Sequence, residues 1–173
     1  MKAMTISKFY PPIAAMILAA ALAIPAAAQQ QVPFKGTFQG KDCVLPENTG
    51  CSPFHSFTIT TSGTGIGTQI GNFSLNQETS LTSAPPAGSA HWVAANGDRI
   101  ESTFVVVSFQ LNTPPGYATI TESHTITGGT GRFAGAQGSF NLERLHVLAP
   151  SADGTHDTFG SYQGSITPPG ATH

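Results

Sequence analysis

The chain has 173 residues, with seven basic and nine acidic side chains, and charged residues make up only 9% of it. This slightly acidic balance, with no basic cluster, argues against a nucleic-acid-binding protein and against one that binds anionic membrane surfaces. Hydrophobic residues make up 39% of the chain, and alternating apolar residues persist throughout, which excludes a disordered chain.

The first 28 residues have the pattern of a secretory signal peptide. Two lysines precede the apolar run Ile13–Ile24, and small residues follow it, so we expect cleavage near Ala28. An apolar run of this length is too short for a membrane span. We therefore expect a secreted or periplasmic protein with no membrane span in the mature chain and a single domain over residues 29–173.

Alternation of polar and apolar residues predicts strands along the whole mature chain. The expected strands, in chain order, are Phe34–Lys41, Phe54–Thr61, Phe73–Leu81, Ala90–Ala95, Arg99–Leu111, Tyr117–Thr127, Ser139–Leu148 and Thr155–Thr167. The glycine-rich segment Ser62–Gly67 is expected to break the second run, and Asn96-Gly97-Asp98 predicts a tight hairpin turn. About eight strands with regular turns predict an all-β chain, as a sandwich or an antiparallel barrel.

An outer-membrane barrel has a similar length, but it needs a girdle of aromatic residues at each membrane interface. One Trp and three Tyr cannot build two girdles. The sequence therefore favours a soluble, single eight-stranded antiparallel β-barrel.

Two cysteines, Cys43 and Cys51, flank a short loop. In an exported protein such a pair most simply forms a disulfide bond, and a redox or metal site would need a C-x-x-C motif or more cysteines. We expect a disulfide that staples this loop.

A glycine-rich corner, Ile126–Phe140, joins two of the predicted strands and reads I-T-G-G-T-G-R-F-A-G-A-Q-G-S-F. Part of it formally matches the dinucleotide fingerprint G-x-G-x-x-A, which works only where a helix begins. Here a strand-like run follows instead. We expect the glycines to allow positive φ in a tight connection and Phe133 to plug one end of the barrel.

The same corner resembles the signature turn of the allene oxide cyclase and dirigent barrel superfamily, and more closely that of uncharacterised secreted bacterial members. The similarity extends to Ala94–Arg99 and Gly160–Ile166. The resemblance implies an eight-stranded antiparallel barrel, of the calycin-like type, with a central cavity, and homo-oligomers, since the plant relatives are often trimers. Plant cyclases bind an unsaturated fatty-acid epoxide, and dirigent proteins steer the coupling of phenoxy radicals. No site residue is carried over from either.

Period-two geometry places four ionisable side chains on apolar strand faces. Glu122 and His124 share the apolar face of one strand next to the corner, and Arg144 and His146 share that of the other. If these faces point inward, a buried charge needs a partner, so we predict a contact between Glu122 and Arg144. Such a cluster could bind a ligand or supply a catalytic base, with Glu122, His124 and Arg144 as the candidates.

Two other interpretations of these four residues stay open: a structural ion pair, or solvent-exposed positions near strand ends. Trp92 is likewise either a core residue or part of a ligand-binding surface. No metal-ligand spacing and no nucleophile elbow is present, so we expect no metal and no cofactor.

Three functions remain in view. The first is a binding protein that holds a small apolar or amphipathic ligand inside the barrel. The second is an isomerase or cyclase of the allene oxide cyclase kind, and the third is a structural or envelope-interaction barrel without a ligand. Whether the protein is an enzyme stays open.

Overall fold

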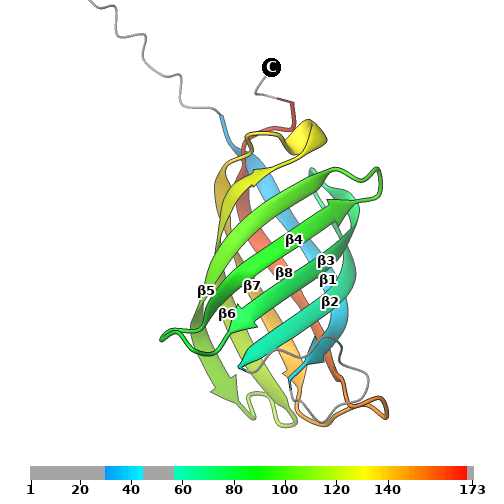
Figure 1. Ribbon diagram of the computed structural model, residues 1–173, viewed down its shortest axis with the longest axis vertical. Helices are drawn as coiled ribbons and strands as arrows, with labels where there is room; N and C mark the ends of the chain where they lie inside the picture. The colour runs from blue at the N-terminus through cyan, green and yellow to red at the C-terminus, as the bar shows by residue number, and fades with distance from the viewer. Residues whose placement is uncertain (1–29, 45–56, 171–173) are drawn as a thin grey trace, which may run out of the picture.

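The computed structural model describes residues 30–44 and 57–170, and these form a closed barrel of eight antiparallel strands in which each strand pairs with its neighbours in sequence (Figure 1). The all-β, eight-stranded barrel predicted from the sequence is confirmed. The elements are β1 (Val32–Cys43), β2 (Thr58–Gly67), β3 (Gly71–Ser80), β4 (Ala87–Ala94), β5 (Arg99–Leu111), β6 (Tyr117–Gly129), the 3-10 helix η1 (Gly131–Phe133), β7 (Gly138–Val147) and β8 (His156–Ile166).

One boundary prediction is wrong in an informative way. The glycine-rich segment Ser62–Gly67 was expected to end a strand, but it is the second half of β2 and pairs with both β1 and β3. Gly63, Gly65 and Gly67 occupy alternate positions there, so they share one face of the strand. The glycines mark close packing inside the barrel and do not mark a turn.

Bulky side chains fill the space that these glycines leave. A Cβ atom on Gly65 would collide with the Phe73 ring and the carbonyl oxygen of Thr37, and one on Gly67 would collide with the Tyr162 hydroxyl. The inner wall formed by β1, β2 and β8 thus carries little side-chain volume at these positions, which leaves room for the aromatic rings of the core.

We therefore expect Gly65→Ala to destabilise the protein by about 1–3 kcal/mol, because the added methyl overpacks the core. In an unobstructed strand position the same change would stabilise by roughly 0.5–1 kcal/mol, since glycine is entropically unfavourable there. Urea unfolding measures the difference. Thr64→Ala, which shortens an outward-facing side chain on the same strand, is the control, and a stabilised Gly65→Ala protein would contradict the packing argument.

The described chain begins and ends at the upper end of the barrel in Figure 1. The interior toward this end is packed with aromatic rings. Trp92 and Phe34 are fully buried, and the ring of Trp92 lies 5.1 Å from Tyr162, 5.2 Å from Phe73 and 5.4 Å from Phe140. All three pairs are edge-to-face or tilted, the geometry that aromatic quadrupoles prefer. Trp92 is therefore a core residue.

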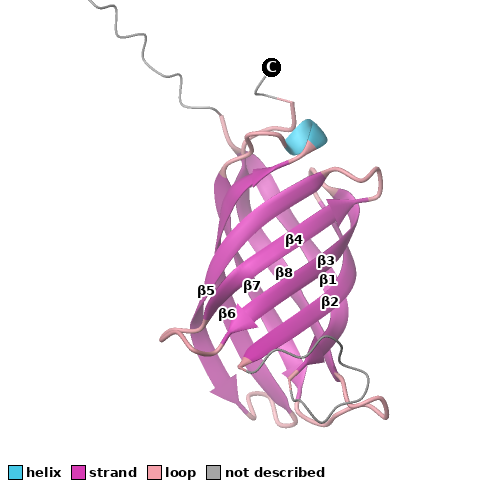
Figure 2. Cartoon of the chain, in the orientation of Figure 1, coloured by secondary structure: helices cyan, strands magenta, loops and turns pink. Residues whose placement is uncertain are grey.

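The glycine-rich corner closes this end. The single turn of η1, drawn in cyan in Figure 2, places Phe133 in the core with 1% exposure, as the sequence analysis expected. Gly131 has φ +58°, and Arg132 pairs with Asp98 of the neighbouring hairpin at 3.6 Å. The two segments therefore contact one another. Because η1 has three residues and a strand, β7, follows it from Gly138, the corner has no helix of the kind that a dinucleotide site requires.

Some predictions fall outside the described residues. These are the signal peptide, the start of the second predicted strand, and Cys51 with the disulfide predicted between it and Cys43. Cys43 itself is the last residue of β1. Within residues 30–44 and 57–170, no helix is long and apolar enough to cross a membrane.

Candidate functional site

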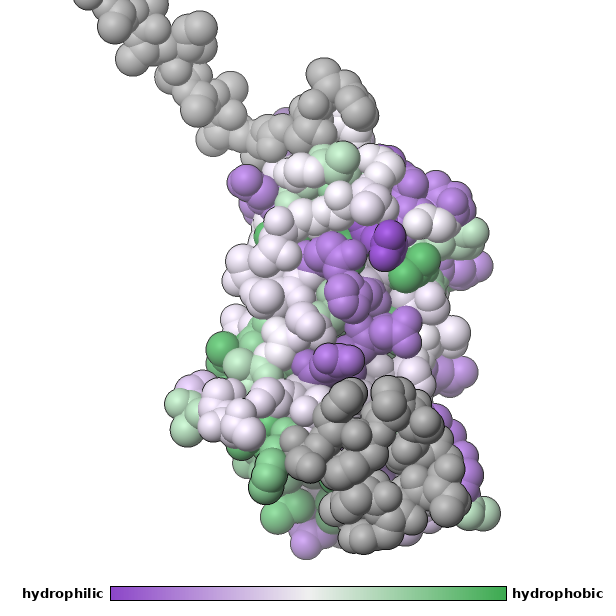
Figure 3. Space-filling model, in the orientation of Figure 1, coloured by the Kyte–Doolittle hydropathy of each residue, from purple (hydrophilic) through white to green (hydrophobic). Residues whose placement is uncertain are grey.

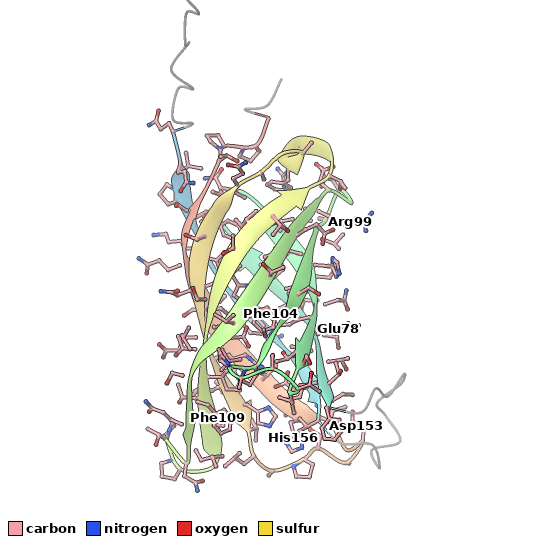
Figure 4. The ribbon with its side chains drawn as sticks, turned by 60° about the vertical axis from the view of Figure 1, so that its left-hand side comes forward. Glu78, Arg99, Phe104, Phe109, Asp153 and His156 are labelled. Atoms are coloured by element: carbon pink, nitrogen blue, oxygen red, sulfur yellow. The ribbon has the colours of Figure 1, made fainter. Side chains whose placement is uncertain are left out.

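Below the aromatic half, the interior of the barrel is polar. The predicted residues Glu122, His124 and Arg144 all point inward and are buried, and the side chain of His146 is 12% exposed. In Figure 4, Phe104, which packs against His124, lies about midway along the barrel, whereas Phe109 and His156 lie near its lower end. The polar network thus occupies the middle and lower interior.

The predicted contact between Glu122 and Arg144 is confirmed, with Nε of Arg144 donating to Oε1 of Glu122 at 3.0 Å. The side-chain amide of Gln77 donates to both oxygens of Glu122 at 3.0 Å, and Nε2 of His124 lies 3.1 Å from Oε2. The carboxylate therefore accepts from three neighbouring side chains, which leaves it little capacity to take up a proton.

Arg144 also binds a second carboxylate that the sequence analysis missed. Its Nη1 donates to Oδ2 of Asp42 at 2.6 Å, and the hydroxyl of Thr61 donates to Oδ1 at 2.6 Å. Nδ1 of His146 lies 2.6 Å from Oδ2 of Asp42, so this nitrogen carries the proton. Among the described residues, no hydrogen bond from Nη2 of Arg144 is found.

His124 continues the network toward the aromatic core. Its ring lies between those of Phe104 and Phe140, at centroid distances of 4.8 and 4.5 Å. Its Nδ1 lies 3.2 Å from the hydroxyl of Ser102, which accepts a bond from Nε1 of Trp92 at 3.2 Å. The Ser102 hydroxyl can therefore donate to Nδ1, and a neutral His124 with its proton on Nε2 satisfies every donor.

The pKa directions agree with this assignment. Burial alone would raise the pKa values of Asp42 and Glu122, but the Arg144 charge and the hydrogen bonds from their histidine partners lower both below their ordinary values. Burial lowers the pKa of His124, despite its bond to Glu122. Burial would lower the pKa of Arg144, but its two carboxylate partners raise it. The network thus holds two carboxylates, one guanidinium and a neutral His124.

A loss of stability in acid follows. Below about pH 6.5 the unfolded chain protonates His124 while the folded protein does not, so the free energy of unfolding falls with pH, by up to about 1.4 kcal/mol per pH unit for one group. Asp42 and Glu122 stabilise the fold above about pH 4, and that stabilisation is lost as the pH falls through their lowered folded pKa values.

Urea unfolding at several pH values, in the wild type and in His124→Gln, tests the histidine part. The variant keeps an amide donor near Glu122 but has no imidazole to protonate. We expect a smaller loss of stability between about pH 6.5 and 5 in the variant. Equal losses in the two proteins would show that His124 is not the group responsible.

A pocket of about 240 Å³ lies toward the lower end of the barrel, and Arg144 of the network forms part of its lining. Its apolar wall includes Ile59, Leu81, Val106, Phe109 and Ile120. Its polar lining residues are Thr79, Ser108 and Arg144, and none of its lining residues is acidic. The hydroxyl of Thr79 is buried and has no hydrogen-bond partner among the described residues.

A β-bulge shapes this pocket. β5 pairs with β4 only as far as Val105, which lies opposite Ala87, and then continues to Leu111. Between Val106 and Ser108 its register against β6 shifts. A bulge inserts one extra residue and reverses the alternation beyond it. Phe109 consequently pairs with the inward-facing Ile120, and the ring is 57% exposed at the pocket mouth. Figure 3 shows apolar surface gathered toward this lower end.

Larger hollows exist on the outer surface of the barrel. One of about 740 Å³ spans β1 to β4 and is lined by outward-facing residues such as Thr37, Thr64 and Asn72. It is a shallow surface with no buried ionisable group among its lining residues. The smaller pocket at the lower end is the better candidate because its lining combines an apolar wall with Arg144 and the buried hydroxyl of Thr79.

Sequence reasoning missed Asp42, Gln77, Ser102 and Thr79, although the signal was present. Asp42 continues the alternation of Phe34 and Phe38 in β1, and Gln77 and Thr79 continue that of Phe73 and Leu75 in β3. Extending the inward faces of β1 and β3 past their last apolar residues would have found these three, and Ser102 lies on the inward face of β5 between Ile100 and Phe104.

Two catalytic arrangements receive no support. The hydrogen bonds run in the order of a nucleophile–base–acid triad through Ser102, His124 and Glu122. However, Ser102 is 2% exposed, does not line the pocket, and its hydroxyl already accepts a hydrogen bond from Trp92. Among the described residues, no group of three or more His, Cys, Asp or Glu side chains is placed to hold a metal ion.

Comparison with known proteins shows a likeness of fold. No protein-family model matches the chain, and no curated protein matches it. Among solved structures, the chain is similar to one described as the pterocarpan synthase dirigent protein GePTS1, with 11% sequence identity, a TM-score of 0.44, and coverage of 79% of this chain and 84% of that one. The likeness concerns the fold alone.

Proposed function

We propose that this protein binds a small apolar or amphipathic molecule in the pocket at the lower end of the barrel. The observation that carries the proposal is the pairing of an apolar wall with a buried, unpartnered hydroxyl on Thr79. A buried polar group without a partner lowers stability, and a ligand acceptor in the adjoining pocket would satisfy the hydroxyl of Thr79. Because the sequence predicts a signal peptide, we further propose that binding takes place outside the cytoplasm.

Binding is favoured over an isomerase or cyclase activity. A catalytic base must reach the substrate, and Glu122 is fully buried, does not line the pocket and has a lowered pKa, which makes it a weak base. Arg144 is the one charged residue that lines the pocket, and a single guanidinium can orient a ligand without transferring a proton.

Methyl NMR with 1-octanol as a neutral amphipathic probe tests the proposal. We expect saturable shifts of the Ile59 and Ile120 methyl signals, which report on the pocket. Ile66, on the outer surface and 61% exposed, is the internal control and should not shift. Val106→Trp should abolish the shifts by filling the pocket, whereas Val105→Trp, on the outward face of the same strand, should not.

If the Ile59 and Ile120 signals do not respond to 1-octanol, octane or 2-octanone, the binding proposal fails. The remaining hypothesis would then be a structural barrel without a ligand.

A further inference from the structure

We infer that the pocket selects an uncharged ligand that carries an oxygen acceptor, such as a ketone, at the end of a short apolar body, and that it discriminates against carboxylates. The inference rests on the proposed function and names the ligand chemistry of the same site. It has two bases. Thr79 and Arg144 each have a hydrogen-bond donor with no bond to an acceptor among the described residues. The buried network around Arg144 has no net positive charge to attract an anion.

Two donors on the pocket lining have no hydrogen bond to an acceptor within residues 30–44 and 57–170. The hydroxyl of Thr79 has no partner among the described residues. Arg144 uses Nε for Glu122 and Nη1 for Asp42, and no bond from Nη2 is found in the same part of the chain. A ligand oxygen with two lone pairs could accept from both donors, and an alkane could accept from neither.

The charge balance decides between a neutral and an anionic acceptor. Asp42 and Glu122 oppose the single charge of Arg144, and His124 is neutral. His146 is hydrogen-bonded to Asp42, and even a positive charge on its ring would leave the network with no net positive charge. A bound carboxylate would lose its hydration and meet two buried carboxylates, so its attraction to Arg144 would not be sufficient compensation.

The size of the pocket limits the apolar body. At roughly 30 Å³ for each water-sized group, about 240 Å³ holds roughly eight such groups. Part of a longer chain could extend along Phe109, which is 57% exposed at the mouth. Eight-carbon molecules are therefore suitable probes.

Dissociation constants of 2-octanone, octane and octanoate, measured at neutral pH by the Ile59 and Ile120 methyl signals of the full chain, test the inference. We expect 2-octanone to bind at least fivefold more tightly than octane and at least tenfold more tightly than octanoate. Thr79→Val, which removes the hydroxyl and keeps the shape, should weaken 2-octanone binding about five- to tenfold and leave octane binding unchanged. Thr60→Val, on the outward face of β2, is the matched control.

The outcomes separate the two proposals. Octanoate binding as tightly as 2-octanone would overturn the inference and leave the binding function standing. Equal binding of 2-octanone to wild type and Thr79→Val would also overturn it, since the hydroxyl would then serve something other than the ligand. Failure of all three probes to shift Ile59 and Ile120 would remove the binding function itself.

Discussion

Replacing Arg144 by methionine is expected to lower the free energy of unfolding by about 3–5 kcal/mol at neutral pH, because Asp42 and Glu122 would remain buried without a cation. Urea unfolding followed by circular dichroism measures the loss. Without Arg144 the folded pKa values of both carboxyls must rise, so the deficit relative to the wild type should shrink as the pH falls toward about 4.

A matched surface variant and a neutral network serve as controls. Arg132→Met removes a half-exposed arginine that pairs with Asp98 at 3.6 Å, and it should cost less than about 1 kcal/mol. Combining Arg144→Met with Asp42→Asn and Glu122→Gln should recover much of the loss, because no unpaired charge is then buried. If the triple variant is as unstable as Arg144→Met, the loss comes from packing and not from charge.

Replacing Trp92 by alanine is expected to destabilise the protein by about 3–5 kcal/mol, the range for removing a large buried aromatic side chain. The indole is fully buried, contacts three other aromatic rings within 5.4 Å and donates to Ser102 at 3.2 Å. Since Trp92 is the only tryptophan of the chain, circular dichroism must replace fluorescence in the measurement.

Two comparisons distinguish a core role from a ligand-binding role for Trp92. Val93→Ala, at the next position and on the other face of β4, should change stability by less than about 0.5 kcal/mol. A Trp92→Ala protein that stays as stable as the wild type but no longer binds 1-octanol would show that the indole forms part of the ligand site, against our assignment.

Half of the polar network could be predicted from the sequence. Glu122 and Arg144 lie on the apolar faces of strands joined by a single corner, so alternation and adjacency were enough to pair them. Asp42 could not be paired in this way, because β1 and β7 are far apart in sequence and β8 lies between them. Closure of the barrel brings Asp42 to Arg144, and closure is a property of all eight strands together.

The pocket itself could not be predicted. Strict alternation along β5 places Phe104, Val106 and Ser108 on one face, yet Phe109 replaces Ser108 there because the register shifts between Val106 and Ser108. A bulge of this kind carries no fixed sequence signature. The predicted break at Ser62–Gly67 was wrong for a related reason, since glycine permits both a turn and the close approach of an aromatic ring.

By itself, therefore, the sequence determined the class of fold, the strands, the inward faces and one ion pair, because period-two alternation records which side of a sheet is buried. Only the tertiary structure decided which inward residues meet, where Trp92 packs and where an unfilled pocket remains. Those outcomes depend on register and on the volumes of side chains from distant strands, and no local pattern encodes either.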